Sequence, residues 1–375
     1  MSPMIGTVEE KIANPFFGRP HVVILGAGAS RASFPKGEAT GRRLPLVADL
    51  VEDVGLHDLL RSRGVVYEGR NLEDVFSDLH EQEPALLREV EQVIHSYFAE
   101  MLLPHEPSLY DHLVLSLREK DVLATFNWDP LLFAACARNH AKATPPYVLH
   151  LHGNVALGYC AIDRTAGSVR STCRKCGGQF RPSRLIYPIR DKDYAADPFL
   201  ASQWTALQGA MKEAYMLTIF GYSAPKTDVK AMEAMKAAWG RAAERELEEI
   251  EIVNLGTEDE LRQTWADFIL SHHYRCRRDF FDSWLAKHPR RSCEAMWNQT
   301  MECKFIGENA VPRATRIEEL WEWYAPLLEA ERSAEARRDD DPSQHSPVKA
   351  RTARSRRAWS LDSHESRPGG GSPAR

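Results

Sequence analysis

Two short polar segments of this sequence hold side chains that could perform acid–base chemistry. One runs from Thr125 to Asp129 and follows the largely apolar run 121–124. The other runs from His150 to Asn154 and follows the apolar run 147–149. Histidine suits proton exchange with a hydroxyl group or with water, because its unperturbed pKa lies near neutral pH. We therefore take Asn127, Asp129 and His152 as the candidate catalytic residues. In a plainer interpretation Asn127 and Asp129 cap the helix that follows them, and both roles can coexist.

A third segment is suited to holding a phosphate. The β-branched run 21–25 leads directly into Gly26-Ala27-Gly28-Ala29-Ser30. Glycine permits backbone conformations and a close approach that a side chain would block, so we expect the amides of Gly26, Gly28 and Ser30 to point at a pyrophosphate oxygen. We assign Gly26, Ala27, Gly28 and Ser30 to cofactor binding. A Gly-x-Gly pair also occurs in ordinary tight turns, so this segment alone does not identify a nucleotide site.

Five apolar runs share this arrangement, which indicates a parallel sheet. Besides the three runs already described, residues 216–220 lead into a loop with Gly221 and Ser223, and residues 249–253 lead into Asn254. Sheets of this kind bind ligands at the carboxyl ends of their strands, so the five loops should meet at one edge. The sequence therefore predicts an α/β fold, a Rossmann-like parallel sheet with flanking helices and a helical insertion.

Two long stretches outside these runs have helical periodicity, one between the first and second strands and one in the C-terminal region 271–330. Between the first and second strands, apolar residues recur at spacings of three and four, which predicts amphipathic helices: Leu72, Val75, Phe76, Leu79, Leu86, Leu87, Val90, Val93, Ile94 and Phe98. We expect them to form a helical subdomain over the nucleotide cleft. The predicted organisation is an N-terminal extension at 1–19, a catalytic domain at 20–270 with its insertion at about 40–118, a helical region at 271–330 and a tail at 331–375.

Composition favours a globular protein without a membrane anchor. The 375 residues carry a net charge of −5 and 43% hydrophobic residues, without an apolar run long enough to span a bilayer. Residues 1–20 lack the pattern of a secretory signal, so we expect a cytoplasmic protein. The segment from Lys349 onward contains seven Lys or Arg residues but only two acidic residues, Asp362 and Glu365. We predict that this tail is a solvated, disordered extension, with contact to nucleic acid as the alternative.

Taken together, the five loops resemble those of the sirtuin family. The Gly-Ala-Gly-x-Ser loop, the Thr-x-Asn-x-Asp loop, the His-Gly pair at His152, the Gly-x-Ser loop at Gly221 and the late Asn254 come in the family's order. The resemblance covers roughly residues 20–270 and implies that NAD is the nucleotide bound. Some sirtuin-like proteins hydrolyse NAD, and an unregulated enzyme of that kind would harm its own cell. The resemblance therefore also leads us to expect oligomerisation or an activating partner protein.

The chain departs from the deacetylase members of that family at two places. They carry a Pro-Asp-Phe-Arg element after the first glycine motif, where this sequence has Ser33-Phe34-Pro35-Lys36-Gly37, and the Gln of their Thr-Gln-Asn-x-Asp loop is Phe126 here. This pattern is more similar to the prokaryotic sirtuin-like NAD hydrolases, which act as effectors in antiphage systems such as Thoeris and short-Argonaute modules.

The resemblance implies a role for each candidate residue. His152 is the base or the residue that orients the ribose, Asn127 binds the ribose or positions water, and Asp129 contacts the carboxamide of nicotinamide. Ser223 and Asn254 contact the adenine-side ribose and the phosphates, or else only close turns. We expect His150 to be structural. The full cofactor-binding set is Gly26, Ala27, Gly28, Ser30, Thr125, Gly221, Ser223 and Asn254.

The seven cysteines are unevenly spaced, which argues for reduced thiols rather than a disulfide framework. Cys173 and Cys176 form a Cys-x-x-Cys pair that could bind a metal, and the family carries a zinc ribbon at this place. Cys160 could be a third ligand, but residues 177–204 contain neither Cys nor His. We therefore expect a degenerate ribbon or a flexible loop at about 156–190, and any bound zinc would be structural.

Three functions are compatible with these residues. The leading hypothesis is hydrolysis of NAD to nicotinamide and ADP-ribose, held in check until a trigger or partner activates the enzyme. The second is an NAD-dependent protein-lysine deacylase, which the missing arginine element and Phe126 disfavour. The third is a non-catalytic sensor that binds NAD or ADP-ribose. The presence of Asn127 and His152 argues against a sensor, because a sensor needs no base.

Overall fold

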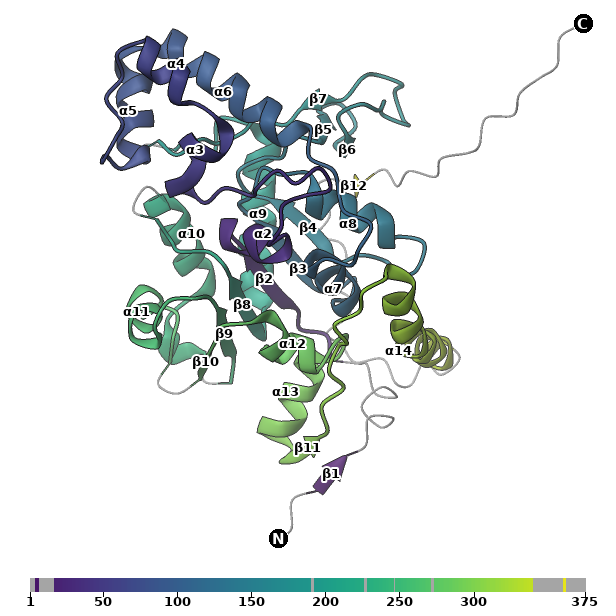
Figure 1. Ribbon diagram of the computed structural model, residues 1–375. Helices are drawn as coiled ribbons and strands as arrows, with labels where there is room; N and C mark the ends of the chain where they lie inside the picture. Colours follow the sequence, from purple (N-terminus) through teal and green to yellow (C-terminus); the bar gives the residue numbers. More distant parts are fainter. Residues whose placement is uncertain are drawn as a thin grey trace, which may run out of the picture.

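The computed structural model describes residues 4–6, 17–189, 192–225, 228–245, 247–270, 273–339 and 360–361. At its centre lies a six-stranded sheet in the order β10-β9-β8-β2-β3-β4, with every neighbouring pair parallel (Figure 1). Its strands are β2 (His21–Leu25), β3 (Val122–Thr125), β4 (Tyr147–His150), β8 (Met216–Phe220), β9 (Glu249–Val253) and β10 (Tyr274–Arg277). The predicted Rossmann-like parallel sheet is confirmed, and all five predicted strands belong to it.

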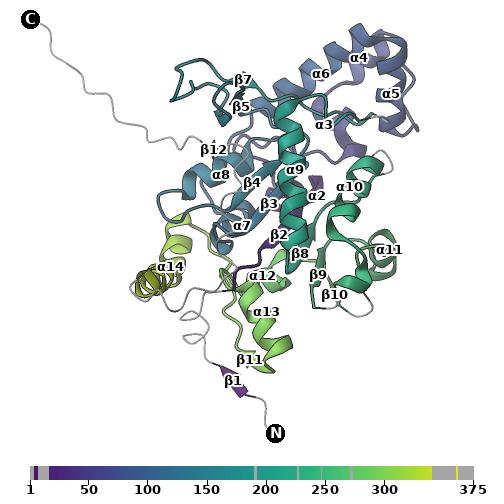
Figure 2. The ribbon, with the colours of Figure 1, turned by 180° about the vertical axis from the view of Figure 1, so that it is seen from behind.

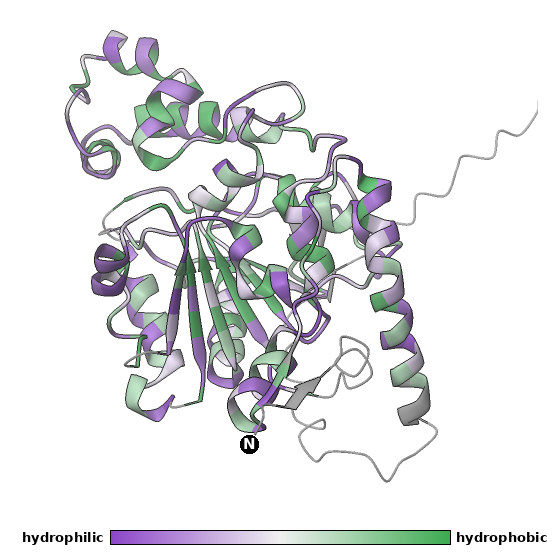
Figure 3. Cartoon of the chain, turned by 60° about the horizontal axis from the view of Figure 1, so that its bottom comes forward, coloured by the Kyte–Doolittle hydropathy of each residue, from purple (hydrophilic) through white to green (hydrophobic). Residues whose placement is uncertain are grey.

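The central strand β2 is buried along its whole length. Val23 and Leu25 belong to one hydrophobic core, and Val22 and Ile24 belong to another. Successive side chains of a strand point to opposite faces, so the two cores lie on opposite sides of the sheet. A parallel sheet covered on both faces needs nearly continuous apolar strands, which is why 21–25 shows no polar alternation. Figure 3 shows the strands of the sheet in the colour of hydrophobic residues along much of their length.

Helices cover both faces of this sheet (Figure 2). Buried side chains of α9, α10 and α11 join the core of Val22 and Ile24, whereas those of α2 to α8, α12 and α14 join the core of Val23 and Leu25. The α-helices are α2 (Ala27–Ser33), α3 (Leu50–Val54), α4 (His57–Ser62), α5 (Leu72–Gln82), α6 (Pro84–Ala99), α7 (Leu109–Ser116), α8 (Leu131–Asn139), α9 (Pro198–Glu213), α10 (Val229–Trp239), α11 (Glu258–Thr264), α12 (Trp284–Lys287), α13 (Ser292–Met301) and α14 (Ile317–Asp339). Short 3₁₀ helices occur at η1 (Val47–Asp49), η3 (Ala242–Glu244) and η4 (Phe280–Asp282).

The predicted helical insertion lies between β2 and β3. All its predicted apolar positions are buried except Val93, which is 38% exposed. Phe98 of α6 packs edge-on against Trp128, with ring centroids 5.8 Å apart, and Phe76 of α5 stacks on Tyr187 at 6.5 Å. These contacts place α5 and α6 beside segments that follow β3 and β7, at the upper left of Figure 1.

A second, smaller sheet follows β4. β5 (Leu157–Cys160) pairs antiparallel with β6 (Thr165–Ser168) and with β7 (Arg181–Pro182). The two-residue strand β12 (Ser360–Leu361) lies beside β6. This is the region in which we expected a degenerate ribbon or a flexible loop.

The region 271–330 is not wholly helical, contrary to prediction. It contains β10 at the edge of the main sheet, and β11 (Lys304–Ile306), which pairs in parallel with β1 (Met4–Gly6). β10 has the sequence Tyr-Arg-Cys-Arg, and its four residues are only partly buried. An edge strand of this kind needs no apolar run, and for that reason the sequence pattern missed it.

The C-terminal helix α14 continues to Asp339, past residue 330 where we expected the tail to begin. Its extension is explained by burial, because Glu331 is 6% exposed and Ala334 is 2% exposed. Apart from β12, the predicted tail beyond Asp339 lies outside the described residues, as does most of the predicted extension at 1–19. In the part of the chain that is described, no helix has both the length and the apolar character needed to cross a bilayer.

Candidate active site

The glycine loop after β2 packs tightly against the loop after β8. Gly26 N donates to Phe220 O at 3.0 Å, and Gly28 N donates to Gly221 O at 2.9 Å. A Cβ on Gly26 would lie 2.6 Å from Gly221 O, and a Cβ on Gly221, where φ is +62°, would lie 2.1 Å from Ala29 N. The expectation that the Gly26 and Gly28 amides point at a pyrophosphate is wrong in this structure. The glycines are instead required by the close contact between the two loops.

Asn127 joins the end of β3 to the glycine loop. Its Nδ2 donates to Gly26 O and to Ser30 Oγ, both at 2.9 Å, and lies 3.2 Å from Tyr110 Oη. Because Gly26 O can only accept, the atom facing it must be the NH₂ group of the side chain. Its backbone N donates to Thr125 Oγ1 at 3.0 Å. The Oδ1 atom of Asn127 is therefore the one left to accept a hydrogen bond from a ligand hydroxyl or from water.

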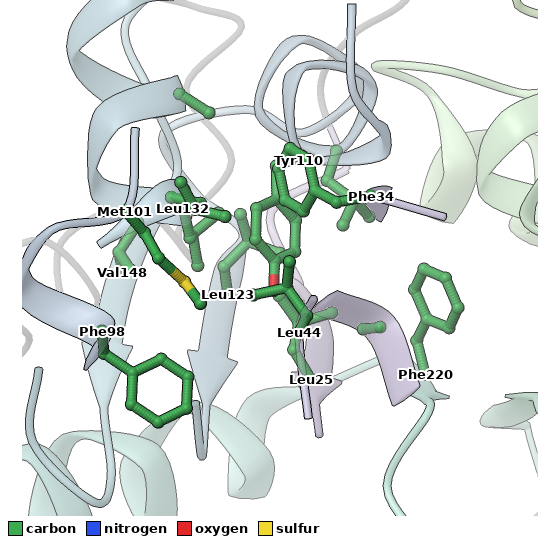
Figure 4. Packing of buried hydrophobic residues seen from close by; sticks show 14 of the residues in the cluster. Leu25, Phe34, Leu44, Phe98, Met101, Tyr110, Leu123, Leu132, Val148 and Phe220 are labelled. Carbon is green, nitrogen blue, oxygen red and sulfur yellow. The ribbon is translucent and has the colours of Figure 1, made fainter. Parts of the chain in front are cut away.

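Ser30 connects this network to Asp129. Ser30 Oγ donates its one proton to Asp129 Oδ2 at 2.7 Å, so the hydroxyl of Tyr110, 2.6 Å away, donates to Ser30. Burial raises the pKa of Tyr110 well above its usual range, which keeps this proton in place. Figure 4 shows Tyr110 among Leu44, Leu123 and neighbouring apolar side chains.

Tyr110 is a site residue that the sequence analysis missed. It belongs to α7, whose start is marked by a capping box between Ser108 and Asp111. That signal predicts a helix but does not place it beside the glycine loop.

Asp129 has two roles at once. Its Oδ1 accepts from Leu131 N, the first residue of α8, at 3.1 Å, while its Oδ2 accepts from Ser30 Oγ at 2.7 Å. Burial raises the pKa of Asp129 above its usual value, and the hydrogen bonds from Ser30 and Leu131 oppose that shift. The helix-capping interpretation is therefore not confirmed for either residue, because the N-cap position of α8 is Pro130, Asp129 lies one residue before it, and Asn127 binds the glycine loop.

His152 is buried beside aromatic rings. It is 7% exposed, and its Nε2 lies 3.2 Å from Tyr194 Oη. The Phe126 ring is nearly perpendicular to the imidazole, with centroids 4.8 Å apart. Phe126 also stacks on Tyr222 at 4.2 Å with an interplanar angle of 4°. Burial lowers the pKa of His152 to about 3, although the carboxylate of Asp228 raises it. The imidazole is therefore neutral at physiological pH, the form that can accept a proton.

Residues on either side of His152 have structural contacts. A Cβ on Gly153, where φ is +79°, would lie 2.0 Å from Arg184 O, which explains the glycine of the His-Gly pair. His150 N donates to Gln203 Oε1 at 3.2 Å, and burial lowers the pKa of the His150 imidazole to about 4. His150 lines a small cavity with space for roughly one water molecule, and its Nδ1 has no partner among the described residues.

Two predicted cofactor residues lie apart from this network. Ser223 is exposed, and Asn254 closes a turn after β9 by accepting from Gly256 N at 3.2 Å. Asn254 N also donates to Arg277 O at 2.9 Å. Both residues lie at the carboxyl edge of the sheet, where their contact with a nucleotide stays a prediction.

The strands β5 and β6 bring together a set of metal-ligating side chains. One ligand atom from each of Cys160, Asp163, Cys173 and Cys176 lies within 4.8 Å of the others. Cys160 Sγ is 3.6 Å from Cys176 Sγ, and Cys173 Sγ is 3.2 Å from Asp163 Oδ2. A tetrahedral zinc with Zn–S bonds of about 2.3 Å separates its ligand atoms by about 3.7 Å, so the donor set fits zinc. Asp163 supplies the fourth donor atom of this set; we expected any fourth donor after Gly177, whereas Asp163 precedes Cys173.

Comparisons with known proteins identify no family. No family model and no curated protein matches the sequence. The solved structures that match include Sir2 proteins. A Sir2–p53 peptide–NAD⁺ complex is 18% identical with a TM-score of 0.33, covering 70% of this chain and 88% of that chain. A Sir2 homolog–NAD complex is 15% identical with a TM-score of 0.36, covering 87% of this chain and 93% of that chain. Identities and TM-scores this low do not establish an activity for this chain. A function must therefore be inferred from the residues described above.

Proposed function

We propose that this chain is a sirtuin-like NAD hydrolase that cleaves NAD to nicotinamide and ADP-ribose. The observation that carries the proposal is the orientation of the Asn127 side chain. Its NH₂ group donates to Gly26 O and to Ser30 Oγ, both at 2.9 Å, and its Oδ1 accepts from no donor in the described chain. An acceptor held in this way at the carboxyl edge of a Rossmann-like sheet is suited to bind a ribose hydroxyl or the attacking water. The order of the five sequence motifs supports NAD as the nucleotide.

The reaction assigns a task to each residue of the site. The bond between the ribose anomeric carbon and the nicotinamide nitrogen breaks, and its electron pair leaves with the nitrogen. The oxygen of water bonds to that carbon and its proton passes to His152, which releases it to solvent. Asn127 positions the ribose or the water, and Asp129 contacts the carboxamide of nicotinamide. NAD and water thus give nicotinamide, ADP-ribose and one proton.

The metal cluster supports the fold of this enzyme rather than its chemistry. Cys160, Asp163, Cys173 and Cys176 would hold a zinc ion that joins β5 to the segment between β6 and β7. With four protein ligands, such a site leaves no position for substrate and is structural.

We further propose that the hydrolase is a gated effector of prokaryotic antiphage defence, activated by oligomerisation or by a partner protein. The closed state of the site supports gating, because Asn127 is only 9% exposed and His152 only 7%. A ribose and a nicotinamide ring need these side chains to become accessible before turnover.

The test is nicotinamide release from NAD by the purified chain, without peptide, in the parent and in Asn127→Ala and His152→Ala. We expect turnover to fall by about 10²- to 10⁴-fold in His152→Ala, the usual contribution of acid–base catalysis. Turnover should also be lost in Asn127→Ala, because the ribose or the water is then no longer positioned. His95→Ala is the matched control, because His95 is an exposed histidine of α6 away from the site.

Two results would contradict the hydrolase. Turnover only in the presence of an acetylated peptide would identify a deacylase. Binding of NAD or ADP-ribose by the parent, with no release of nicotinamide under any activating condition, would identify a sensor.

A further inference from the structure

His152 faces a buried ion pair that the proposed reaction does not yet use. Asp228, directly before α10, places its Oδ1 3.9 Å from His152 Nε2. The same oxygen forms a salt bridge with the ammonium group of Lys192, and both side chains are 3% exposed. One carboxylate therefore stands between the imidazole and a lysine.

Two tyrosines complete the surroundings of this pair. Tyr222 Oη donates to Asp228 Oδ2 at 2.8 Å. The Tyr194 ring stacks on the His152 ring, with centroids 5.7 Å apart and an interplanar angle of 17°. Glu73 of α5 adds a negative charge that acts on Tyr222. Among the described residues, the charged groups that act on His152 itself are Asp228 and Lys192.

The two charges have opposite effects on the imidazole. A carboxylate within about 4–6 Å favours the imidazolium form, and a nearby ammonium group disfavours it. While Lys192 neutralises Asp228, burial dominates and the pKa of His152 stays near 3. A buried Lys–Asp pair contributes little net stability, because removing both charges from water costs about as much as their attraction returns. Stability alone therefore does not account for this pair.

We propose that Asp228 is the positioning residue of His152. While the site is closed, the salt bridge with Lys192 keeps Asp228 from acting on the imidazole. The inference deepens the proposed function, on which it rests for the identity of the reaction. Lys192 and Tyr194 lie two residues apart, so one movement of this segment takes both side chains away from His152. Asp228 is then free to orient the imidazole and to stabilise the imidazolium that forms when water gives up its proton.

The experiment follows the protonation of His152 directly, by NMR of the full chain labelled with ¹³C at histidine Cε1. The His152 signal is identified by its loss in His152→Gln. The parent, Lys192→Met and the double variant Lys192→Met with Asp228→Asn are titrated from pH 5 to pH 8. Lys236→Met is the matched control, because Lys236 pairs with Asp267 on the surface. Lys192→Gln replaces Lys192→Met if the latter does not fold, which thermal unfolding reports.

We expect no titration of His152 in the parent or in Lys236→Met. In Lys192→Met the midpoint should rise by at least two pH units and enter the range studied, and Asp228→Asn should abolish that rise. A His152 that stays silent in Lys192→Met and in Lys192→Gln, or that titrates alike with and without Asp228, would overturn the proposal. Nicotinamide release is measured on the same samples, so failure of the NAD hydrolase proposal is seen separately.

Discussion

At the scale of single residues, the site is a network in which each proton has one assigned place. Ser30 donates to Asp129, Tyr110 donates to Ser30, and Asn127 donates to the glycine loop. Buried hydrogen bonds of this kind fix side-chain orientation more than they add net stability. The residue that depends most on this order is Asn127, whose acceptor atom is aimed only as long as its NH₂ group is held.

Replacement of Tyr110 by Phe tests this order. Loss of the hydroxyl removes one of the two hydrogen bonds that Ser30 Oγ accepts and leaves only the one from Asn127. We expect kcat for nicotinamide release to fall about tenfold, the effect of about 1.4 kcal/mol. The free energy of unfolding should fall by about 1–2 kcal/mol. Tyr324→Phe is the matched control, since Tyr324 Oη also lies 2.6 Å from a buried serine hydroxyl, that of Ser116. An equal loss of kcat in both variants would contradict a positioning role for Tyr110.

At the scale of elements, the sheet tolerates one buried carboxyl in the middle of a strand. Glu251 of β9 is fully buried and accepts from Trp284 N at 2.8 Å, which connects the sheet to α12. Burial raises the pKa of Glu251 to about 7, although this hydrogen bond opposes the shift. The folded state therefore keeps a proton that the unfolded chain releases at lower pH.

The sign of the resulting pH dependence follows from linkage. Between the unfolded pKa of 4.5 and the folded pKa of about 7, the folded state binds more protons, so stability falls as pH rises. Glu251→Gln removes this dependence. We expect its unfolding free energy, relative to the parent, to rise by roughly 3 kcal/mol from pH 4.5 to pH 8. Chemical denaturation at several pH values measures it, and a constant difference between the two proteins would contradict the assignment.

The β5–β6 element gives a prediction about metal. Purified protein should contain about one zinc per chain by elemental analysis, as a four-ligand site requires. Cys173→Ser and Asp163→Asn should reduce the zinc content and the thermal midpoint, and strong chelators should do the same. Cys303→Ser is the control, because Cys303 is an exposed cysteine outside the cluster. A parent protein free of zinc after growth with zinc would refute the site.

At the scale of the whole molecule, buried charges attach α14 to α7 and to the connection between α12 and α13. Glu331 forms salt bridges with Arg290 and Arg291, whose side chains are 5% and 2% exposed. Arg290 in turn donates to Leu115 O and Leu117 O, at the end of α7. The helix that carries Tyr110 is therefore held at its far end by the C-terminal part of the chain.

Breaking this attachment should be costly. Glu331→Gln leaves two buried guanidinium groups without their carboxylate, and loss of one partner of a buried ion pair costs roughly 3–5 kcal/mol. Glu329→Gln removes an exposed pair with Arg332 and should cost less than about 1 kcal/mol. Equal unfolding free energies for the two variants would show that the buried cluster does not hold α14.

The sequence predicted the sheet better than the site, for physical reasons. Parallel strands buried on both faces consist of apolar runs, so five of the six strands were found. The edge strand β10 is only partly buried and has no such run. The proximity of Asn127 to Ser30 was expected, because the loops at the carboxyl ends of parallel strands meet at one edge of the sheet. Tyr110 could not be found, because its role depends on how α7 packs in three dimensions. Asp163 was missed because a fourth ligand was sought among Cys and His residues after Gly177, whereas Asp163 is a carboxylate before Cys173.

The strand order also constrains how the chain is made. β2 ends at Leu25, yet its two neighbours, β3 and β8, end at Thr125 and Phe220. With synthesis at about 5–20 residues per second, the most apolar strand waits roughly 10–40 s for its second partner to leave the ribosome. Until β3 is made both edges of β2 are unpaired, and until β8 is made one edge still is, which leaves the strand prone to aggregation. Yield in cells should therefore depend on chaperone supply during translation more than on the stability of the finished fold.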